Sequence, residues 1–135
     1  MKILIVGGVA GGATAAARIR RLDEQAEIVV FERSGFISYA NCGLPYYIGG
    51  EIAERDKLLV TTAERLHARF NLDVRTHSSV EAIDREAKSV RVREVLTGRE
   101  YTETYDRLIL ATGAAPFRPE IPGIDLPGVF TLRNL

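Results

Sequence analysis

Short runs of apolar and β-branched residues alternate with glycine-rich and polar stretches along the chain. The run KILIV at residues 2–6 predicts a strand that is buried on both faces of a parallel sheet. The runs EIVVFE at residues 27–32 and RLILA at residues 107–111 predict two more strands of this kind. Residues 13–22 predict a helix, which completes a βαβ unit with the first two strands. Small side chains on one side of the helix would let it approach the sheet closely: Ala13, Ala16 and Ala17.

The middle of the chain carries start signals for two more helices. Asn41 is a residue type that caps helices, so a short helix is expected to begin around Cys42. Thr61 with Glu64 three residues later matches a capping box, which predicts a helix that runs to about Phe70. Short strands are then predicted around Val74 and at residues 80–83, 90–95 and 101–105.

Composition narrows the class of protein. The 135 residues suit one domain or part of one, and 46% hydrophobic with 27% charged residues is typical of a globular chain. Eighteen Lys and Arg balance eighteen Asp and Glu, so we expect neither a nucleic-acid partner nor a membrane partner. The single cysteine excludes an intrachain disulfide and a cysteine-rich zinc site, and a reduced, cytoplasmic setting fits best. No metal site is expected.

The glycines after the first strand form a candidate dinucleotide-binding loop. A strand, GGVAGG at residues 7–12, a helix and a strand ending at Glu32 are the context that a dinucleotide fingerprint requires. Such a loop aims free backbone N–H groups at a pyrophosphate, and the carboxylate would accept bonds from the adenosine ribose. Val9 replaces the usual middle glycine, and we expect Gly8 and Gly11 to restore room for the phosphates. The alternative is a glycine-rich turn that only packs helix against strand.

Cys42 is the second candidate site. It lies in SYANCGLPY at residues 38–46, at the expected start of a helix, where the helix dipole and free N–H groups would stabilise a thiolate. No second cysteine exists to form a dithiol, so a redox cycle would pass through a mixed disulfide with an external thiol or through a sulfenate. The alternative is a small buried hydrophobic residue.

Three stretches together carry a family resemblance: KILIVGGVAGGATAAARIRRLD, FERSGFISYANCGLPYYIGG and YDRLILATGAAP. They resemble the single-cysteine class of flavoprotein pyridine nucleotide-disulfide oxidoreductases, which includes coenzyme A disulfide reductases, persulfide reductases, NADH oxidases and NADH peroxidases. The resemblance covers essentially the whole chain. It implies an α/β fold, namely a Rossmann-like FAD/NAD(P)-binding domain with a parallel sheet, flanking helices and a small antiparallel β-meander. It also implies an enzyme that uses FAD, with NAD(P)H as the hydride donor.

The resemblance assigns roles to individual positions. Cys42 would be the catalytic residue and would lie against the isoalloxazine. The remaining positions that would contact FAD are Gly7, Gly8, Val9, Ala10, Gly11, Gly12, Glu32, Arg33, Asn41, Val80, Ala111, Thr112, Gly113 and Arg133. The positions that would hold a coenzyme A substrate are Thr14, Arg18, Arg21, Ser38 and Asn41.

Position 10 favours one substrate group within this class. Members that reduce peroxide or oxygen carry a histidine there, whereas this chain has Ala10, which cannot assist a sulfenate. We therefore expect coenzyme A disulfide or persulfide as the substrate. Arg18 and Arg21 lie one turn apart and could face one phosphorylated ligand, or they could be solvated surface residues. A lysine that some members place near Phe70 is absent here, which weakens the coenzyme A assignment. The alternative functions are an NADH oxidase or peroxidase of the same family and a non-catalytic dinucleotide-binding module.

The carboxyl end predicts how the chain is organised. Four of the five prolines lie in the last twenty residues, which is typical of an extended connector. We expect residues 1–115 to form the N-terminal part of a FAD-binding domain with its redox cysteine. We expect residues 116–135 to lead toward an NAD(P)H-binding domain that this chain lacks. By resemblance the full-length protein would be a homodimer, and these residues alone would be inactive.

Overall fold

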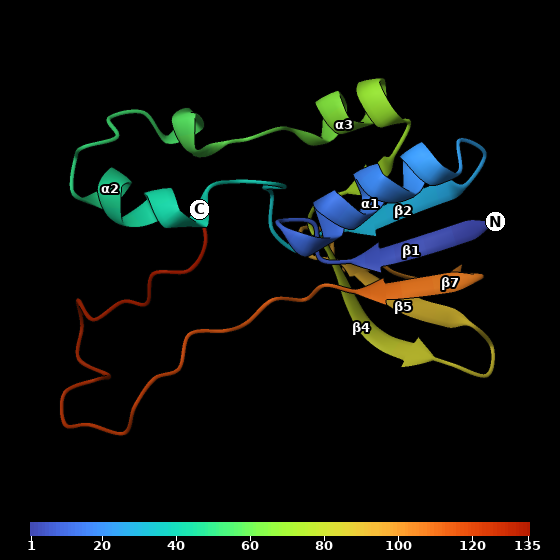
Figure 1. Ribbon diagram of the computed structural model, residues 1–135. Helices are drawn as coiled ribbons and strands as arrows, with labels where there is room; N and C mark the ends of the chain where they lie inside the picture. Colours follow the sequence, from blue (N-terminus) through green and yellow to red (C-terminus); the bar gives the residue numbers. More distant parts are fainter.

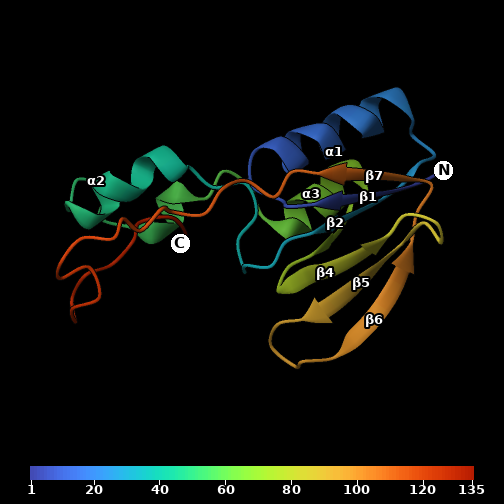
Figure 2. The ribbon, with the colours of Figure 1, turned by 90° about the horizontal axis from the view of Figure 1, so that it is seen from below.

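The structure is a computed structural model that describes residues 1–135, and its larger part has three layers (Figures 1 and 2). The central layer is a parallel sheet of four strands, in the order β3-β2-β1-β7. These strands are β1 (Lys2–Val6), β2 (Glu27–Phe31), β3 (Asp73–Arg75) and β7 (Arg107–Leu110). Helices α1 (Gly11–Leu22) and α3 (Ala63–Phe70) lie over one face. An antiparallel sheet lies over the other face, formed by β4 (Ser78–Asp84), β5 (Ser89–Glu94) and β6 (Glu100–Thr104).

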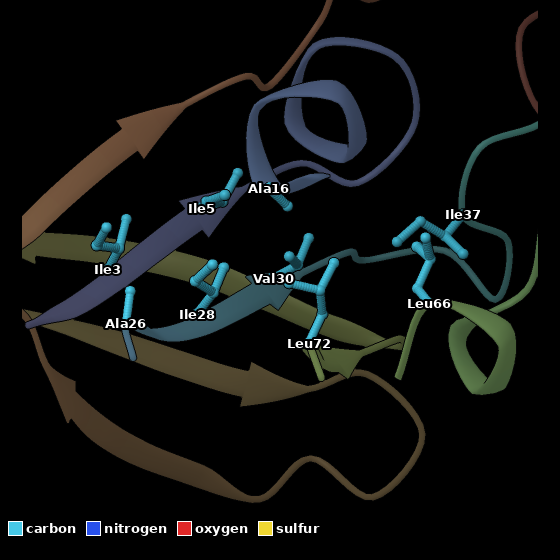
Figure 3. Close-up of a cluster of buried hydrophobic side chains, with 9 residues drawn as sticks. All are labelled: Ile3, Ile5, Ala16, Ala26, Ile28, Val30, Ile37, Leu66 and Leu72. Atoms are coloured by element: carbon cyan, nitrogen blue, oxygen red, sulfur yellow. The ribbon is translucent and has the colours of Figure 1, made fainter. Parts of the chain in front are cut away.

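This arrangement confirms the predicted fold class, and the strands of the parallel sheet explain why. Along β1, Ile3 and Ile5 pack toward the helices, whereas Leu4 packs toward the antiparallel sheet. Figure 3 shows the helix-side cluster, in which Ile3, Ile5 and their neighbours on β2 meet Ala16 of α1 and Leu66 of α3. Both faces of the strand are therefore apolar, which is why the sequence reads as an unbroken hydrophobic run.

A second, smaller unit is formed by the residues between β2 and α3. It contains a 3₁₀ turn at Asn41–Gly43, the short helix α2 (Leu44–Ile48) and a 3₁₀ turn at Arg55–Leu58. Its core is Tyr39, Leu44 and Leu58. The residues after β7 form no helix or strand, and they return to this unit so that Leu135 packs against its core (Figure 1).

Two predicted helix starts are wrong. Asn41 does not cap the short helix, because α2 begins after Gly43 and has no side-chain cap. Thr61 does not cap α3 either, because the neighbouring Thr62 is the N-cap and its side chain accepts a hydrogen bond from the Arg65 amide at 3.3 Å. Both threonines are residue types that cap helices, but only Thr61 has a glutamate three residues later, so the path of the chain overrides that local signal. No helix in the structure is long and apolar enough to cross a bilayer.

Arg20 joins α1 to α3, a role that the sequence did not predict. Its guanidinium donates to the carbonyl oxygens of Phe70 at 2.7 Å and Asn71 at 3.0 Å, at the end of α3. It also donates to the carbonyl oxygens of Asp23 and Glu24, just past the end of α1. One cation therefore pairs with free carbonyl groups at the C-terminal ends of both helices.

A charged network joins the two sheets on the opposite side of the parallel sheet. Glu103 on β6 accepts hydrogen bonds from Lys2 of β1, at 2.6 Å, and from Arg75 of β3. Burial alone would raise the pKa of Glu103, but these two bonds outweigh it and lower the pKa below its ordinary value. Bonds to Glu103 and Glu27 raise the pKa of Lys2 in turn.

We predict that Glu103→Gln lowers the free energy of unfolding at pH 7 by about 1–2 kcal/mol, because two partly buried cations lose the carboxylate that they share, and only their separate pairs with Glu27 and Asp73 remain. The pKa of Glu103 is lower in the folded than in the unfolded state, where it is about 4.3, so its contribution is complete above that pH. The contribution is lost as the pH falls through the folded pKa. The free energies of unfolding of wild type and variant, measured in urea, should therefore converge as the pH falls below the folded-state pKa of Glu103.

The matched control is Glu100→Gln on the same strand, since Glu100 is exposed and forms no ion pair. Equal losses in the two variants at pH 7 would show that the network does not stabilise the fold.

Candidate cofactor and substrate sites

In the turn between β1 and α1, the backbone at Gly7 lies so close to the backbone at Gly12 and at Ala111 that no side chain would fit between them. A Cβ atom on Gly12 would lie 1.7 Å from the carbonyl oxygen of Gly7. Gly7 itself has a φ of +97°, and a Cβ there would lie 2.2 Å from the carbonyl oxygen of Ala111. Both glycines are therefore required by the packing of α1 and β7 on β1.

Gly11 needs a different explanation. A Cβ atom there would meet only the Cβ of Ala111 at 3.6 Å, an ordinary contact, so the packing of the chain does not require glycine. The N-terminus of α1 also has no side-chain cap and no acidic residue in its first turn. Free helical N–H groups beside an open glycine surface suit a bound anion, and this fits the pyrophosphate of a dinucleotide.

Glu32 lies at the end of β2 and is buried, at 8% exposure. One carboxylate oxygen accepts a hydrogen bond from the Gly8 amide at 2.8 Å. The other accepts from the amide and the hydroxyl of Ser34, at 2.9 and 2.8 Å. The Gly8 amide is thus not among the free N–H groups of the loop. The carboxylate oxygen that Gly8 binds has a further lone pair, so Glu32 can still accept a ribose hydroxyl.

Two adjoining cavities lie along the carboxyl ends of β1, β2 and β7, and we call them the cofactor cleft. Their volumes are about 140 and 300 Å³, and Gly7, Glu32 and Thr112 line both. The cleft brings together all the predicted FAD positions except Gly8, Gly12 and Cys42. The predicted positions that line it are Gly7, Val9, Ala10, Gly11, Glu32, Arg33, Asn41, Val80, Ala111, Thr112, Gly113 and Arg133.

Asn41 and Arg133 close one end of the cleft. In the amide orientation that pairs both of its polar atoms, Asn41 donates to the Tyr39 carbonyl at 3.2 Å and accepts from Arg133 Nη1 at 2.9 Å. Arg133 also donates through Nε to the Ala114 carbonyl at 2.8 Å. Asn41, predicted as a helix cap, thus ties the C-terminal residues to the segment that carries Cys42.

Tyr39 is a cleft residue that no sequence signal identified. Its ring is buried and its hydroxyl donates to Asn134 Oδ1 at 3.3 Å. Burial raises the pKa of Tyr39, against the opposing effect of nearby Arg133, so its hydroxyl stays protonated at neutral pH. Ser34, which holds Glu32, could have been suspected because a hydroxyl two residues after a carboxylate commonly closes such a turn.

Cys42 is exposed and lies in the 3₁₀ turn before α2. It lines neither cavity of the cleft, although its neighbour Asn41 does. The sulfur is therefore accessible to an external disulfide. The predicted buried alternative for this cysteine is wrong.

A third cavity of about 420 Å³ lies between α1 and α3. It brings together four of the five predicted substrate positions, Thr14, Arg18, Arg21 and Ser38, whereas Asn41 lies in the cofactor cleft. Thr61, expected as a helix cap, lines this cavity instead. Ser38 separates the two sites: its amide donates to the Gly8 carbonyl at 3.3 Å, and its carbonyl accepts from the Val60 amide at 2.9 Å.

The chain is similar to proteins of known function. The family model described as pyridine nucleotide-disulphide oxidoreductase matches residues 1–135. Coenzyme A disulfide reductase from Staphylococcus aureus strain JH9 is 43% identical over 134 residues, which are 99% of this chain. The chain spans 30% of the length of that relative.

Several solved structures share the fold. Reduced CoADR-RHD of Bacillus anthracis is 57% identical with a TM-score of 0.95, over 99% of this chain and 24% of that chain. An NAD-dependent persulfide reductase of A. fulgidus is 43% identical with a TM-score of 0.90, over 98% and 24%. A water-forming NADH oxidase of Lactobacillus brevis is 35% identical with a TM-score of 0.84, over 93% and 28%.

We predict that alanine at two adjacent glycines separates packing from cofactor binding. Gly12→Ala should lower the free energy of unfolding by about 1–3 kcal/mol, because the new methyl group collides with backbone. Gly11→Ala should leave it within about 1 kcal/mol of wild type, yet reduce the flavin that the protein retains. Thermal unfolding and flavin absorbance after gel filtration measure the two effects. Full flavin retention by the stable Gly11→Ala variant would mean that this loop does not hold the cofactor.

Proposed function

This chain belongs to the pyridine nucleotide-disulphide oxidoreductase family, and from that we propose that it is the FAD-binding, cysteine-bearing part of an NAD(P)H-dependent disulfide reductase. One observation carries the proposal. The uncapped N-terminus of α1, the buried Glu32 and the pair Asn41–Arg133 surround one cleft, and an accessible Cys42 directly follows Asn41.

We propose coenzyme A disulfide or persulfide as the substrate. Two kinds of relative support this choice: the Staphylococcus aureus coenzyme A disulfide reductase and the A. fulgidus persulfide reductase. The cavity between α1 and α3 supports it as well, because Arg18 and Arg21 both line it and neither forms an ion pair within the chain. Guanidinium groups without partners suit a phosphorylated ligand.

The residues of the cleft would share the work of holding FAD. The N–H groups that open α1 would bind the pyrophosphate, and Glu32 would accept from the adenosine ribose. Asn41 and Arg133 would fix the chain beside the isoalloxazine end. When bound, FAD would supply the carrier for a pair of electrons that originate in NAD(P)H.

Cys42 would act on the substrate directly. Its thiolate would attack one sulfur of the disulfide, which forms a Cys42–substrate mixed disulfide and expels the other half as a thiolate that takes up a proton. Delivery of two electrons to the mixed disulfide would break it, restore the Cys42 thiolate and release the second thiol after protonation. No second cysteine of this chain is needed.

In this proposal, NAD(P)H, the hydride donor, binds to a part of the protein outside these 135 residues. These 135 residues contain one dinucleotide fingerprint, at Gly7–Gly12, and the proposal commits it to FAD. We propose that residues 116–135 lead toward the part of the protein that binds NAD(P)H. The proposal, by resemblance, also includes a homodimer that functions in the cytoplasm.

We predict that Cys42→Ser in the full-length protein retains FAD but reduces coenzyme A disulfide at least about a thousandfold more slowly, since a neutral hydroxyl cannot replace the thiolate nucleophile. Flavin absorbance and steady-state oxidation of NADH and NADPH measure the two properties. Turnover that survives in Cys42→Ser would sink the proposal that this sulfur reacts. A full-length wild type without bound flavin would favour a non-catalytic nucleotide-binding module.

We also predict that the full-length protein reduces coenzyme A disulfide or persulfide with a higher kcat/KM than hydrogen peroxide or oxygen. The reason is Ala10, which lines the cleft but offers no proton and no hydrogen bond to a sulfenate on the cysteine. Steady-state kinetics with each acceptor decide this point. A large advantage for oxygen would make the chain part of an NADH oxidase, the activity of its Lactobacillus brevis relative.

A further inference from the structure

We propose that Ser34 is a positioning residue of the cofactor cleft, because its hydroxyl holds the carboxylate of Glu32 so that one oxygen, Oε2, receives a hydroxyl group of the adenosine ribose of FAD. The inference rests on the proposed function, since it takes FAD as the occupant of the cleft. It adds a residue to which neither the sequence pattern nor the family resemblance assigned a role.

Glu32 is buried and yet has no cationic partner. No Lys or Arg forms an ion pair with it. A buried carboxylate needs hydrogen bonds in place of the water that it has lost. Three uncharged donors supply them, namely the amide of Gly8 and the amide and hydroxyl of Ser34. The negative charge is therefore held in place without being neutralised, and it remains able to attract a further donor from a ligand.

The three bonds are shared unequally between the two carboxylate oxygens. Oε1 accepts both bonds from Ser34, at 2.9 Å from the amide and 2.8 Å from the hydroxyl. Oε2 accepts one bond, from the Gly8 amide at 2.8 Å. Each oxygen has two lone pairs, so Oε1 is saturated and Oε2 retains one. Glu32 lines both cavities of the cofactor cleft, and Oε2 is the oxygen with which it can bind a ribose hydroxyl.

The neighbours of Ser34 fix the direction of its one hydroxyl proton. Its Oγ lies 2.8 Å from Glu32 Oε1 and 3.1 Å from the carbonyl oxygen of Phe36. The proton goes to the carboxylate, because that bond is shorter and its acceptor is charged. The amide of Phe36 donates to the same Oγ at 3.3 Å. The two bonds form a chain from Phe36 through Ser34 to Glu32, and each bond in such a chain strengthens the next.

The connection between β3 and β4 supports this turn from outside. The carbonyl of Ser34 accepts a hydrogen bond from the His77 amide at 3.0 Å, and the carbonyl of Glu32 accepts one from the Ser78 amide at 3.0 Å. The imidazole of His77 covers Gly35, where a Cβ atom would lie 2.9 Å from two ring atoms. His77 has a φ of +51°, which costs energy in a residue other than glycine and persists only where surrounding contacts hold it. The backbone that carries both Ser34 and Glu32 is thus fixed.

The hydroxyl of Ser34 adds something that the fixed backbone does not supply. Without it, the amides of Gly8 and Ser34 would still bind the carboxylate and close the turn. The last torsion of a glutamate side chain is broad, however, so a carboxylate with one bond fewer can turn about its Cγ–Cδ bond. The hydroxyl therefore fixes the direction in which Oε2 offers its free lone pair. Its removal is expected to act on the affinity for the ribose more than on the fold.

The test measures flavin binding to the flavin-free full-length protein by titration calorimetry. The probes are FAD and its analogue with a 2′,3′-dideoxyribose in the adenosine, which has no hydroxyl for Glu32. We expect wild type to bind FAD about tenfold more tightly than the analogue, because only FAD bonds to Oε2. We expect Ser34→Ala to bind FAD about fivefold more weakly than wild type and the analogue equally well, so that its preference for FAD falls to about twofold.

A matched control and a second pair of variants separate positioning from general damage. Ser89→Ala removes a hydroxyl from β5, at a residue that lines neither cavity of the cleft, and it should leave both affinities unchanged. Ser34→Thr retains the hydroxyl and should keep the preference for FAD, whereas the isosteric Ser34→Val should lose it. This pair decides the point if Ser34→Ala does not fold.

The outcomes distinguish this inference from the proposed function. A full-length wild type with no affinity for FAD would contradict the proposed function, and the inference would fall with it. Equal affinities of wild type for FAD and the analogue would overturn the inference but leave FAD as the cofactor. A wild-type preference that survives in Ser34→Ala or Ser34→Val, or an equal weakening of both ligands in these variants, would overturn the positioning role of Ser34 alone.

Discussion

The close approach of the first helix to the first strand is the constraint on which the rest of the structure depends. It requires Gly12 to lie against the carbonyl oxygen of Gly7, at a distance that no side chain could share. The same approach buries Ala16 on the sheet and leaves the first helical N–H groups uncapped at its carboxyl edge. The cofactor cleft is thus a consequence of the packing. Gly11 is the loop glycine at which a Cβ atom would make only an ordinary contact, and that residue lines the cleft.

Charged side chains are paired in one part of the molecule and lack partners in another. On the side of the antiparallel sheet, Glu103 is matched with Lys2 and Arg75, and the resulting network holds three strands together. On the side of the helices, four exposed arginines form no ion pair with a carboxylate: Arg18, Arg21, Arg65 and Arg69. The network around Glu103 therefore serves the fold, whereas exposed cations without a carboxylate partner are free to meet an external anion. Arg20 is the exception among the arginines of α1, since backbone carbonyls satisfy it.

The segment around Cys42 is held by contacts from distant parts of the sequence. Leu135 packs on the small core of this segment, and Arg133 donates to the side chain of Asn41. Ser38 joins the segment to the glycine loop on one side and to the residues before α3 on the other. The sulfur of Cys42 is exposed and lines neither the cofactor cleft nor the cavity between α1 and α3. This placement suits a thiol that exchanges with an external disulfide.

The sequence by itself determined the fold class, the order of the strands along the chain and the glycine loop, because hydrophobic periodicity and the positions of glycines between apolar runs are local signals. It also named most residues of the cofactor cleft and four of the residues that meet between α1 and α3. Tertiary structure alone decided the cap of α3, the role of Asn41, the burial of Tyr39 and the joining of Arg21 and Arg69 at Phe70. Each of these depends on contacts between residues far apart in the chain, whose energies exceed the small differences between neighbouring local choices.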